Sequence, residues 1–197
     1  MNPRLYSMAY TLKDVFYLDT EATIAAATAG SGTAQLDLSA YIDPIARGRT
    51  KGTGLAVYKV HYMVAQSTNG EPIDDAEAGS FRAGLFAGAG FGDTATGDGP
   101  AFAGNSFVAT NNLLVSAFDF YGPKSMVGNP STTPTMYNEL IKPSTEVPYV
   151  IVRDNVCLAY DVGDNMTGAH TVSVRLECAQ ITLDQATLNQ LLRTQTV

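Results

Sequence analysis

Apolar and polar side chains alternate along several segments of this chain, which is typical of β-strands that bury one face. In residues 34–43 the even positions are apolar and most of the odd positions are polar. Residues 55–64, 149–162 and 171–178 follow the same pattern, although Asp154 interrupts the apolar face of the second of these. Half-buried strands of this kind predict antiparallel sheets with a packed inner face.

Weaker patterns of the same kind occur at residues 81–87, 106–110 and 136–141. Residues 113–121 differ from them, because this segment is apolar on both faces and includes Phe118 and Phe120. A strand that is apolar on both faces needs cover on both sides. We therefore expect a second layer, or a partner, over the outer face of this strand.

Glycine, proline, asparagine and aspartate gather between these segments, most clearly at residues 69–72 and 88–104. About eight strands with such turns predict an all-β protein, an antiparallel sandwich, for which we favour a single jelly roll. The chain is interpreted as one structural domain. Residues 1–33 form an N-terminal extension, residues 34–182 the sandwich, and residues 183–197 a C-terminal helix and tail.

The C-terminal region carries the clearest helical pattern. Residues 182–185 match a capping box, in which a Thr side chain and a Gln three residues later bind the first amides of a helix. Leu188, Leu191 and Leu192 then fall on one helical face. Residues 22–29 are a second, weaker helix candidate.

Charged residues make up 16% of the 197 residues and hydrophobic residues 45%, whereas ordinary domains carry about 25% charged residues. The deficit indicates either a surface covered by partners or an uncharged polar surface. The net charge of −7 disfavours nucleic-acid binding, which depends on positive charge to neutralise phosphates. The sequence shows neither a signal-peptide pattern nor an apolar run long enough for a membrane span. We therefore expect synthesis as a soluble protein in the cytoplasm.

Candidate catalytic groups are few. The two histidines, His61 and His170, are interpreted as ordinary surface residues, and neither a GxSxG elbow nor a P-loop motif is present. Cys157 and Cys178 fall on opposite faces of their predicted strands, so we expect two free thiols rather than a disulfide. These observations predict that the chain is not an enzyme.

Carboxylates cluster in two predicted loops. Asp74, Asp75 and Glu77 are close in sequence, and Asp93 and Asp98 follow in the next loop. Carboxylate oxygens are ligands that Ca²⁺ prefers, but the EF-hand pattern is absent, and a solvated acidic loop is the favoured interpretation. Asp74, Asp75 and Glu77 are the candidate Ca²⁺ site, and no other cofactor is expected.

The remaining signals concern contacts between subunits. Aromatic residues gather near the N-terminus, basic residues gather in the turn near residue 49, and leucines line the C-terminal helix. Tyrosine and phenylalanine are frequent in the cores of protein interfaces. The candidate self-assembly residues are Tyr6, Tyr10, Phe16, Tyr17, Arg47, Arg49, Lys51, Phe118, Phe120, Leu188, Leu191 and Leu192.

The alternating strands, long loops, low charge and terminal segments, taken over residues 35–182, resemble the single jelly-roll capsid proteins of tailless icosahedral viruses. The resemblance implies a self-assembling subunit of a symmetric shell, located in the virion, whose partners are copies of itself and other virion proteins. It implies no functional residues, because it concerns architecture alone. Two alternatives stay open: a carbohydrate-binding sandwich module, and a decoration or spike protein on a virion.

Overall fold

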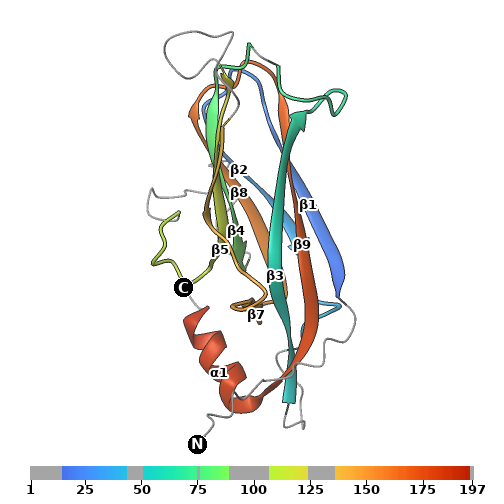
Figure 1. Cartoon of the computed structure of the whole chain (residues 1–197). Helices are drawn as coiled ribbons and strands as arrows, with labels where there is room; N and C mark the ends of the chain where they lie inside the picture. The colour runs from blue at the N-terminus through green and yellow to red at the C-terminus, as the bar shows by residue number, and fades with distance from the viewer. Residues whose placement is uncertain (1–14, 44–50, 75, 89–106, 124–135, 196–197) are drawn as a thin grey trace, which may run out of the picture.

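The computed structural model describes residues 15–43, 51–74, 76–88, 107–123 and 136–195. These residues form two antiparallel sheets that face each other, with one helix near the C-terminus (Figure 1). The first sheet contains, in spatial order, β1 (Phe16–Ile24), β9 (His170–Asp184), β3 (Lys51–Gln66) and β7 (Tyr149–Ile151). The second sheet contains β2 (Gly30–Asp37), β8 (Asn155–Asp164), β4 (Ser80–Ala87), β5 (Leu114–Tyr121) and β6 (Met136–Ile141). The helix α1 (Gln185–Thr194) follows β9 directly. Among the described residues, no helix has the length and hydropathy that crossing a bilayer requires.

The strands pair in the nested order of a jelly roll. The first strand pairs with the last, β1 with β9, and β2 then pairs with β8, β3 with β7 and β4 with β5. β6 is an additional edge strand beside β5. A long antiparallel hairpin that is rolled into two sheets produces this order. The predicted antiparallel sandwich and single jelly roll are therefore confirmed.

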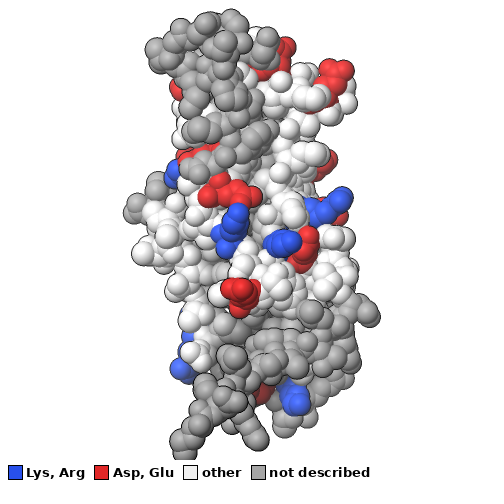
Figure 2. Space-filling view, in the orientation of Figure 1, with Lys and Arg blue, Asp and Glu red and all other residues white. Residues whose placement is uncertain are grey.

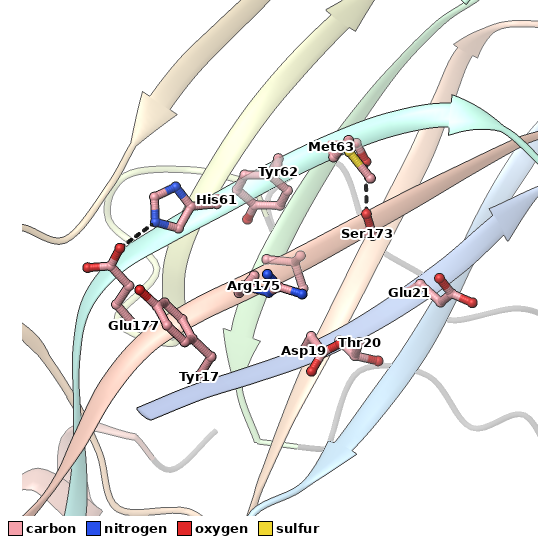
Figure 3. Close-up of a pocket in the computed structure, with 11 residues that line it drawn as sticks. Tyr17, Asp19, Thr20, Glu21, His61, Tyr62, Met63, Ser173, Arg175 and Glu177 are labelled. Atoms are coloured by element: carbon pink, nitrogen blue, oxygen red, sulfur yellow. Dashed lines mark hydrogen bonds and ion pairs between the residues drawn. The ribbon is translucent and has the colours of Figure 1, made fainter. Parts of the chain in front are cut away.

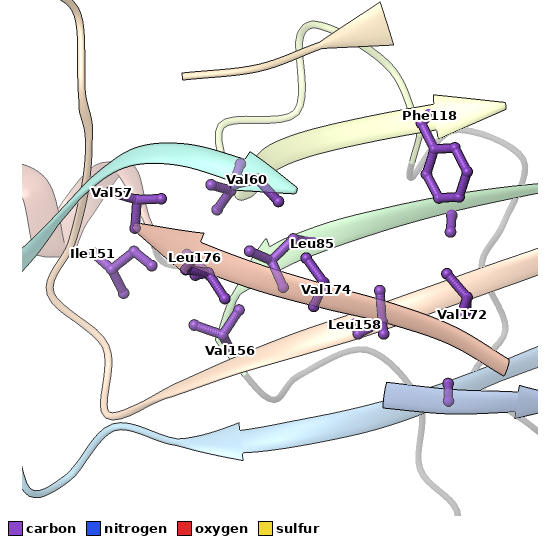
Figure 4. Packing of buried hydrophobic residues seen from close by; sticks show 14 of the residues in the cluster. Val57, Val60, Leu85, Phe118, Ile151, Val156, Leu158, Val172, Val174 and Leu176 are labelled. Carbon is purple, nitrogen blue, oxygen red and sulfur yellow. The ribbon is translucent and has the colours of Figure 1, made fainter. Parts of the chain in front are cut away.

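The main hydrophobic core lies between the two sheets (Figure 4). Val172, Val174 and Leu176 are alternate residues of β9 and are buried, and they pack in one cluster with Leu85 of β4 and Leu158 of β8. The period-two pattern of β9 thus corresponds to its inward face. In β3 the inward positions change from odd to even at the bulge between Val57 and Lys59. Burial of one such side chain stabilises a fold by about 1.5–3 kcal/mol relative to exposure, so this cluster holds the two sheets together.

Both sides of β5 are covered by the same chain. Phe118 and Phe120 belong to the core between the sheets and are 1% and 0% exposed. Leu114 and Ala117 belong to a second, smaller cluster, which is partly covered by Phe107. The apolar pattern on both faces of this strand therefore reflects burial within the subunit. This finding corrects the assignment of Phe118 and Phe120 to a self-assembly surface.

Several segments differ from the sequence-based prediction. β1 begins at Phe16, inside the predicted N-terminal extension, and pairs with β9 along its whole length. Residues 22–29 are the end of β1 and a turn rather than a helix, because Ala22 and Ile24 face the core at a spacing of two residues. Residues 107–110 form turns instead of the strand expected there.

The strand expected at residues 149–162 is divided into two strands in different sheets. β7 ends at Ile151 in the first sheet, and β8 begins at Asn155 in the second. Asp154 lies in the bend between them, and its carbonyl oxygen accepts a hydrogen bond from the amide of Leu38 at 2.6 Å. The polar residue that interrupts the apolar pattern therefore marks the point where the chain crosses between sheets.

The N-cap of α1 is Asp184 rather than Thr182. β9 extends to Asp184, so Thr182 is still part of a strand, and the Asp184 carboxylate accepts a hydrogen bond from the amide of Thr187 at 2.7 Å. At the other end of the helix, the Gln195 side chain accepts a hydrogen bond from the amide of Val152 at 3.2 Å. Both ends of α1 are therefore fixed by specific contacts.

The leucine face of α1 packs on its own sandwich. Leu188 is fully buried and lies against β3 at Gly52, where an added Cβ would approach a Leu188 methyl group to 2.8 Å. Leu191 and Leu192 are half-buried. Leu188 is thus a core residue, which corrects its assignment to a self-assembly surface.

We expect Asp184→Ala to lower the melting temperature by about 2–4 °C, because the substitution leaves the Thr187 amide without its capping acceptor. Thr182→Ala, which changes the residue suggested by the capping motif, should leave the melting temperature nearly unchanged. Thermal unfolding followed by circular dichroism measures both variants. A larger loss for Thr182→Ala than for Asp184→Ala would contradict this assignment of the cap.

Candidate interaction surface

The outer face of the first sheet carries a groove whose lining is set by strand register. β1, β9 and β3 lie side by side, and their pairing aligns outward residues in rows across the sheet (Figure 3). The three rows are Tyr17, Glu177 and Lys59; Asp19, Arg175 and His61; and Glu21, Ser173 and Met63. All of these residues except Lys59 line the groove, which has a volume of about 750 Å³.

Exposed apolar side chains are concentrated on this face. Tyr17 and Met63 are 60% and 64% exposed, and Val15, which precedes β1 in the same alternation, is 50% exposed. The other large apolar side chains that are exposed in the described part of the chain are Leu140 and Val147. Tyrosine, methionine and arginine are enriched at protein interfaces, and the groove contains all three. The groove is therefore rich in residue types that are frequent at protein interfaces.

The charges of the groove are distributed unevenly. Glu177 of β9 lies 2.9 Å from Nε2 of His61 and 4.0 Å from Nζ of Lys59, so these two residues of β3 share one carboxylate. The Arg175 guanidinium lies 5.9 Å from the centre of the Tyr17 ring, a cation–π contact. Within the described part of the chain, Asp19 of β1 forms no ion pair.

In the described part of the chain, the serine hydroxyl and the imidazole of the groove are not hydrogen-bonded to each other. A nucleophile must lie within hydrogen-bond reach of a base, and the base available in the groove is His61, which bonds to Glu177. The Ser173 hydroxyl lines the same groove, but it donates to the backbone oxygen of Met63 at 3.4 Å (Figure 3). His61 is exposed, as the sequence predicts.

A second group of polar residues lies at the connection between β3 and β4. Glu77 is 2% exposed, and its Oε1 accepts hydrogen bonds from the amides of Gly79 at 2.6 Å and Thr167 at 2.8 Å. Its Oε2 accepts from the amide of Gly168 at 3.1 Å and lies 3.5 Å from Nε2 of His170. Burial by itself raises the pKa of Glu77, but the three amides and His170 outweigh it, so the pKa is lowered.

These contacts correct two expectations. His170 is buried and not a surface residue, and its Nδ1 lies 2.8 Å from the carbonyl oxygen of Gly168. Both carboxylate oxygens of Glu77 are used by amides of the protein, and Asp74 accepts from the amide of Ala76 at 2.8 Å. Asp75 lies outside the described residues. Among the residues that are described, no group of three potential ligands is placed to hold a metal ion. Glu77 is buried rather than solvated, and the Ca²⁺ site at Asp74, Asp75 and Glu77 stays a prediction.

An ion pair on the outer side of the second sheet was not apparent from the sequence. Arg82 of β4 and Asp119 of β5 are directly opposite in the strand pairing, and two guanidinium nitrogens donate to the two carboxylate oxygens at 2.6 and 2.8 Å. The hydrogen bonds to Asp119 raise the pKa of Arg82. Both residues interrupt apolar strand patterns, which is the signal that could have identified the pair.

The two cysteines are free, as the parity of their strands predicts, and both are buried. Cys178 belongs to the core between the sheets. Burial raises the pKa of Cys157 to about 11 and that of Cys178 to about 12. Neither thiol is a reactive thiolate near neutral pH.

Of the predicted self-assembly residues, the structure places Tyr17 in the groove. Phe16 is half-buried and stacks on the ring of Tyr41, with ring centres 5.0 Å apart. Lys51 is exposed at the start of β3, opposite Asp184. The predicted residues Tyr6, Tyr10, Arg47 and Arg49 lie outside the described residues. The other groove residues were not predicted, because they become neighbours only through the pairing of distant strands.

Neither a model of a known protein family nor a curated protein sequence matches this chain. Solved structures of polyomavirus VP1 proteins resemble it. The VP1 of Merkel cell polyomavirus in complex with disialyllactose has a TM-score of 0.39 and 8% identity, over 86% of this chain and 99% of that chain. The VP1 of human polyomavirus 12 in complex with 3'-sialyllactosamine has a TM-score of 0.38 and 9% identity, over 86% and 100% of the two chains.

The sequence suggested a resemblance to jelly-roll capsid proteins, and these VP1 structures match the chain at low TM-scores and low identities. The fold assigned to this chain rests on its own strand order.

Proposed function

We propose that this chain is a self-assembling structural protein, the capsid subunit of a symmetric viral shell. The observation that carries the proposal is the outer face of the first sheet, where Val15, Tyr17 and Met63 expose apolar surface around a groove. A jelly roll is compatible with a shell subunit, but this fold also serves other functions. The exposed contact surface is therefore the stronger support.

The low content of charge gives further support. In Figure 2, charged side chains of both signs lie next to each other in the middle of the view, and most of the described surface around them is uncharged. Soluble domains usually carry about 25–35% charged residues on their surfaces. The whole chain contains 16% charged residues, and contact between charge-poor surfaces of two copies desolvates few charged groups.

We expect the purified protein to form large symmetric assemblies, visible by light scattering and negative-stain electron microscopy. The double variant Tyr17→Ser/Met63→Ser should weaken association at least tenfold while it keeps the melting temperature of the subunit, because both side chains are exposed. A tenfold loss corresponds to about 1.4 kcal/mol.

The matched control is Leu140→Ser/Val147→Ser, which removes exposed apolar side chains from outside the groove and should leave assembly unchanged. A wild-type chain that stays monomeric at every concentration and salt condition would contradict the proposed function.

A carbohydrate-binding module is the second candidate, and the groove itself favours it. Tyr17 offers an exposed ring beside Arg175, and Asp19 and Glu21 supply carboxylates on the same side of the groove. Ligand sites commonly combine an aromatic surface with a few polar groups. A monomer that binds a glycan, and loses binding in Tyr17→Ser, would support this function instead.

A further inference from the structure

We infer that two copies of this chain meet through the outer face of the first sheet, with the acidic residues of β1 in one copy against the basic residues of β3 in the other. The acidic column consists of Asp19 and Glu21, and the basic column consists of Lys59 and His61. The inference rests on the proposed function, because it names the surface through which the subunit assembles.

The two columns carry opposite charge on opposite sides of one strand. β9 separates β1 from β3, and neighbouring strands are about 4.8 Å apart, so the columns are about 10 Å apart. The Debye length at physiological ionic strength is about 8 Å. At this separation the columns do not cancel each other, and a partner meets them as two distinct charged patches.

The acidic column has charge available for a partner. In the described residues, neither Asp19 nor Glu21 forms an ion pair, although Asp19 is opposite Arg175 in the strand pairing. The Arg175 guanidinium lies over the ring of Tyr17. In the basic column, Lys59 is 55% exposed at its side chain and 4.0 Å from Glu177, so it also retains charge for another contact. His61 lies beside Lys59 and contacts the same carboxylate at 2.9 Å.

A second copy fits this pattern better than other partners. A nucleic acid or an anionic membrane would be repelled by Asp19 and Glu21, which lie in the same groove as Arg175. A purely basic partner would be repelled by Lys59. A second copy of the same face presents an acidic and a basic column at the same separation. The acidic column of each copy can therefore lie against the basic column of the other.

Apolar and charged residues have different roles in this contact. Val15, Tyr17 and Met63 supply surface that is removed from water when two faces meet. Exposed charges contribute less to affinity, but they exclude wrong partners and fix the register of the two faces. Reversing the charges of one column should therefore prevent the correct pairing even though the apolar residues remain.

The test is a reciprocal reversal of charge. The acidic-column variant is Asp19→Lys/Glu21→Lys, and the basic-column variant is Lys59→Glu/His61→Glu. We expect each variant alone to associate at least tenfold more weakly than wild type in analytical ultracentrifugation at 150 mM salt. An equal mixture of the two should recover association to within about threefold of wild type, because each reversed column then meets its complement.

The matched control for the acidic-column variant is Glu71→Lys/Glu146→Lys, which changes the net charge by the same amount at exposed positions outside the groove. It should associate as wild type does. If a reversed variant does not fold, Asp19→Asn/Glu21→Gln keeps the side-chain shapes and should weaken association as well.

The outcomes separate this inference from the proposed function. If wild type assembles and the reversed variants are folded but assemble equally well, the pairing of columns is wrong while the proposed function stands. If each reversal prevents assembly and the mixture does not recover it, the pairing is also wrong. If wild type remains a monomer under all conditions, both fall.

Discussion

Glu77→Gln should lower the free energy of unfolding by about 2–4 kcal/mol at neutral pH. A glutamine amide group in the place of Oε2 would present its own N–H to the amide of Gly168, which now donates to that oxygen at 3.1 Å. The oxygen of glutamine can still accept from Gly79 and Thr167, so part of the network survives. Glu77→Ala should lower the free energy of unfolding further than Glu77→Gln does, because all three amides then lose their acceptor.

The size of this effect follows from the position of Glu77. The residue joins the β3–β4 connection to the turn between β8 and β9, and it is buried with His170. Space for rearrangement is small, since an added Cβ at Gly122 would lie 2.5 Å from the Glu77 carbonyl oxygen. An amide that loses its buried acceptor stays out of contact with water, so the free-energy cost of its desolvation is no longer offset by a hydrogen bond.

Glu71→Gln is the matched control, because Glu71 lies in the same connection but is exposed. It should change the free energy of unfolding by less than about 0.5 kcal/mol. Urea denaturation followed by circular dichroism measures both variants. Equal effects of Glu71→Gln and Glu77→Gln would show that the buried network does not stabilise the fold.

The stabilising effect of Glu77 should also depend on pH. Its pKa is lowered below the ordinary value of 4.5 in the folded protein, so its ionised form stabilises the fold. This stabilisation is complete above pH 4.5 and is lost as the pH falls through the lowered pKa. The difference in stability between wild type and Glu77→Gln should therefore narrow between pH 7 and pH 3. A difference that stays constant over this range would contradict the lowered pKa.

The alternation of the sequence predicted the inward faces of several strands, because half-buried strands must alternate. It did not reveal β1, whose inward positions include Thr20 and whose outward positions include Tyr17. An inward polar residue and an outward aromatic residue weaken the pattern. The strand is defined instead by its pairing with β9, in which Phe16 is opposite Cys178.

Strand order and the candidate surface depend on pairings between distant segments, which a local pattern does not contain. Tyr17, Arg175 and Met63 come from three strands and become neighbours only when β9 lies between β1 and β3. Glu77 and His170 were predicted to be exposed because charged and polar residues usually are. Their burial is stabilised by amides from turns far away in the sequence.

Phe118→Ala should lower the free energy of unfolding by about 3–5 kcal/mol, as deletion of a buried aromatic ring typically does. The Phe118 ring lies 4.4 Å from the ring centre of Tyr62 and 5.8 Å, edge to face, from that of Phe81. These contacts join β5 to β3 in the other sheet and to β4 beside it. Removal of the Phe118 ring therefore weakens the packing between the two sheets as well as the packing within the second sheet.

Comparison of Tyr17→Ala with Phe118→Ala distinguishes an aromatic residue on the surface from one in the core. Tyr17 is 60% exposed, so its removal should change the free energy of unfolding by less than about 1 kcal/mol and should weaken assembly instead. Phe118→Leu, which keeps an apolar side chain in the core, should recover much of the stability lost in Phe118→Ala. Urea denaturation and sedimentation of the three variants test both statements. If Phe118→Ala changes assembly but leaves the stability of the subunit unchanged, Phe118 belongs to an interface and its place in the core is wrong.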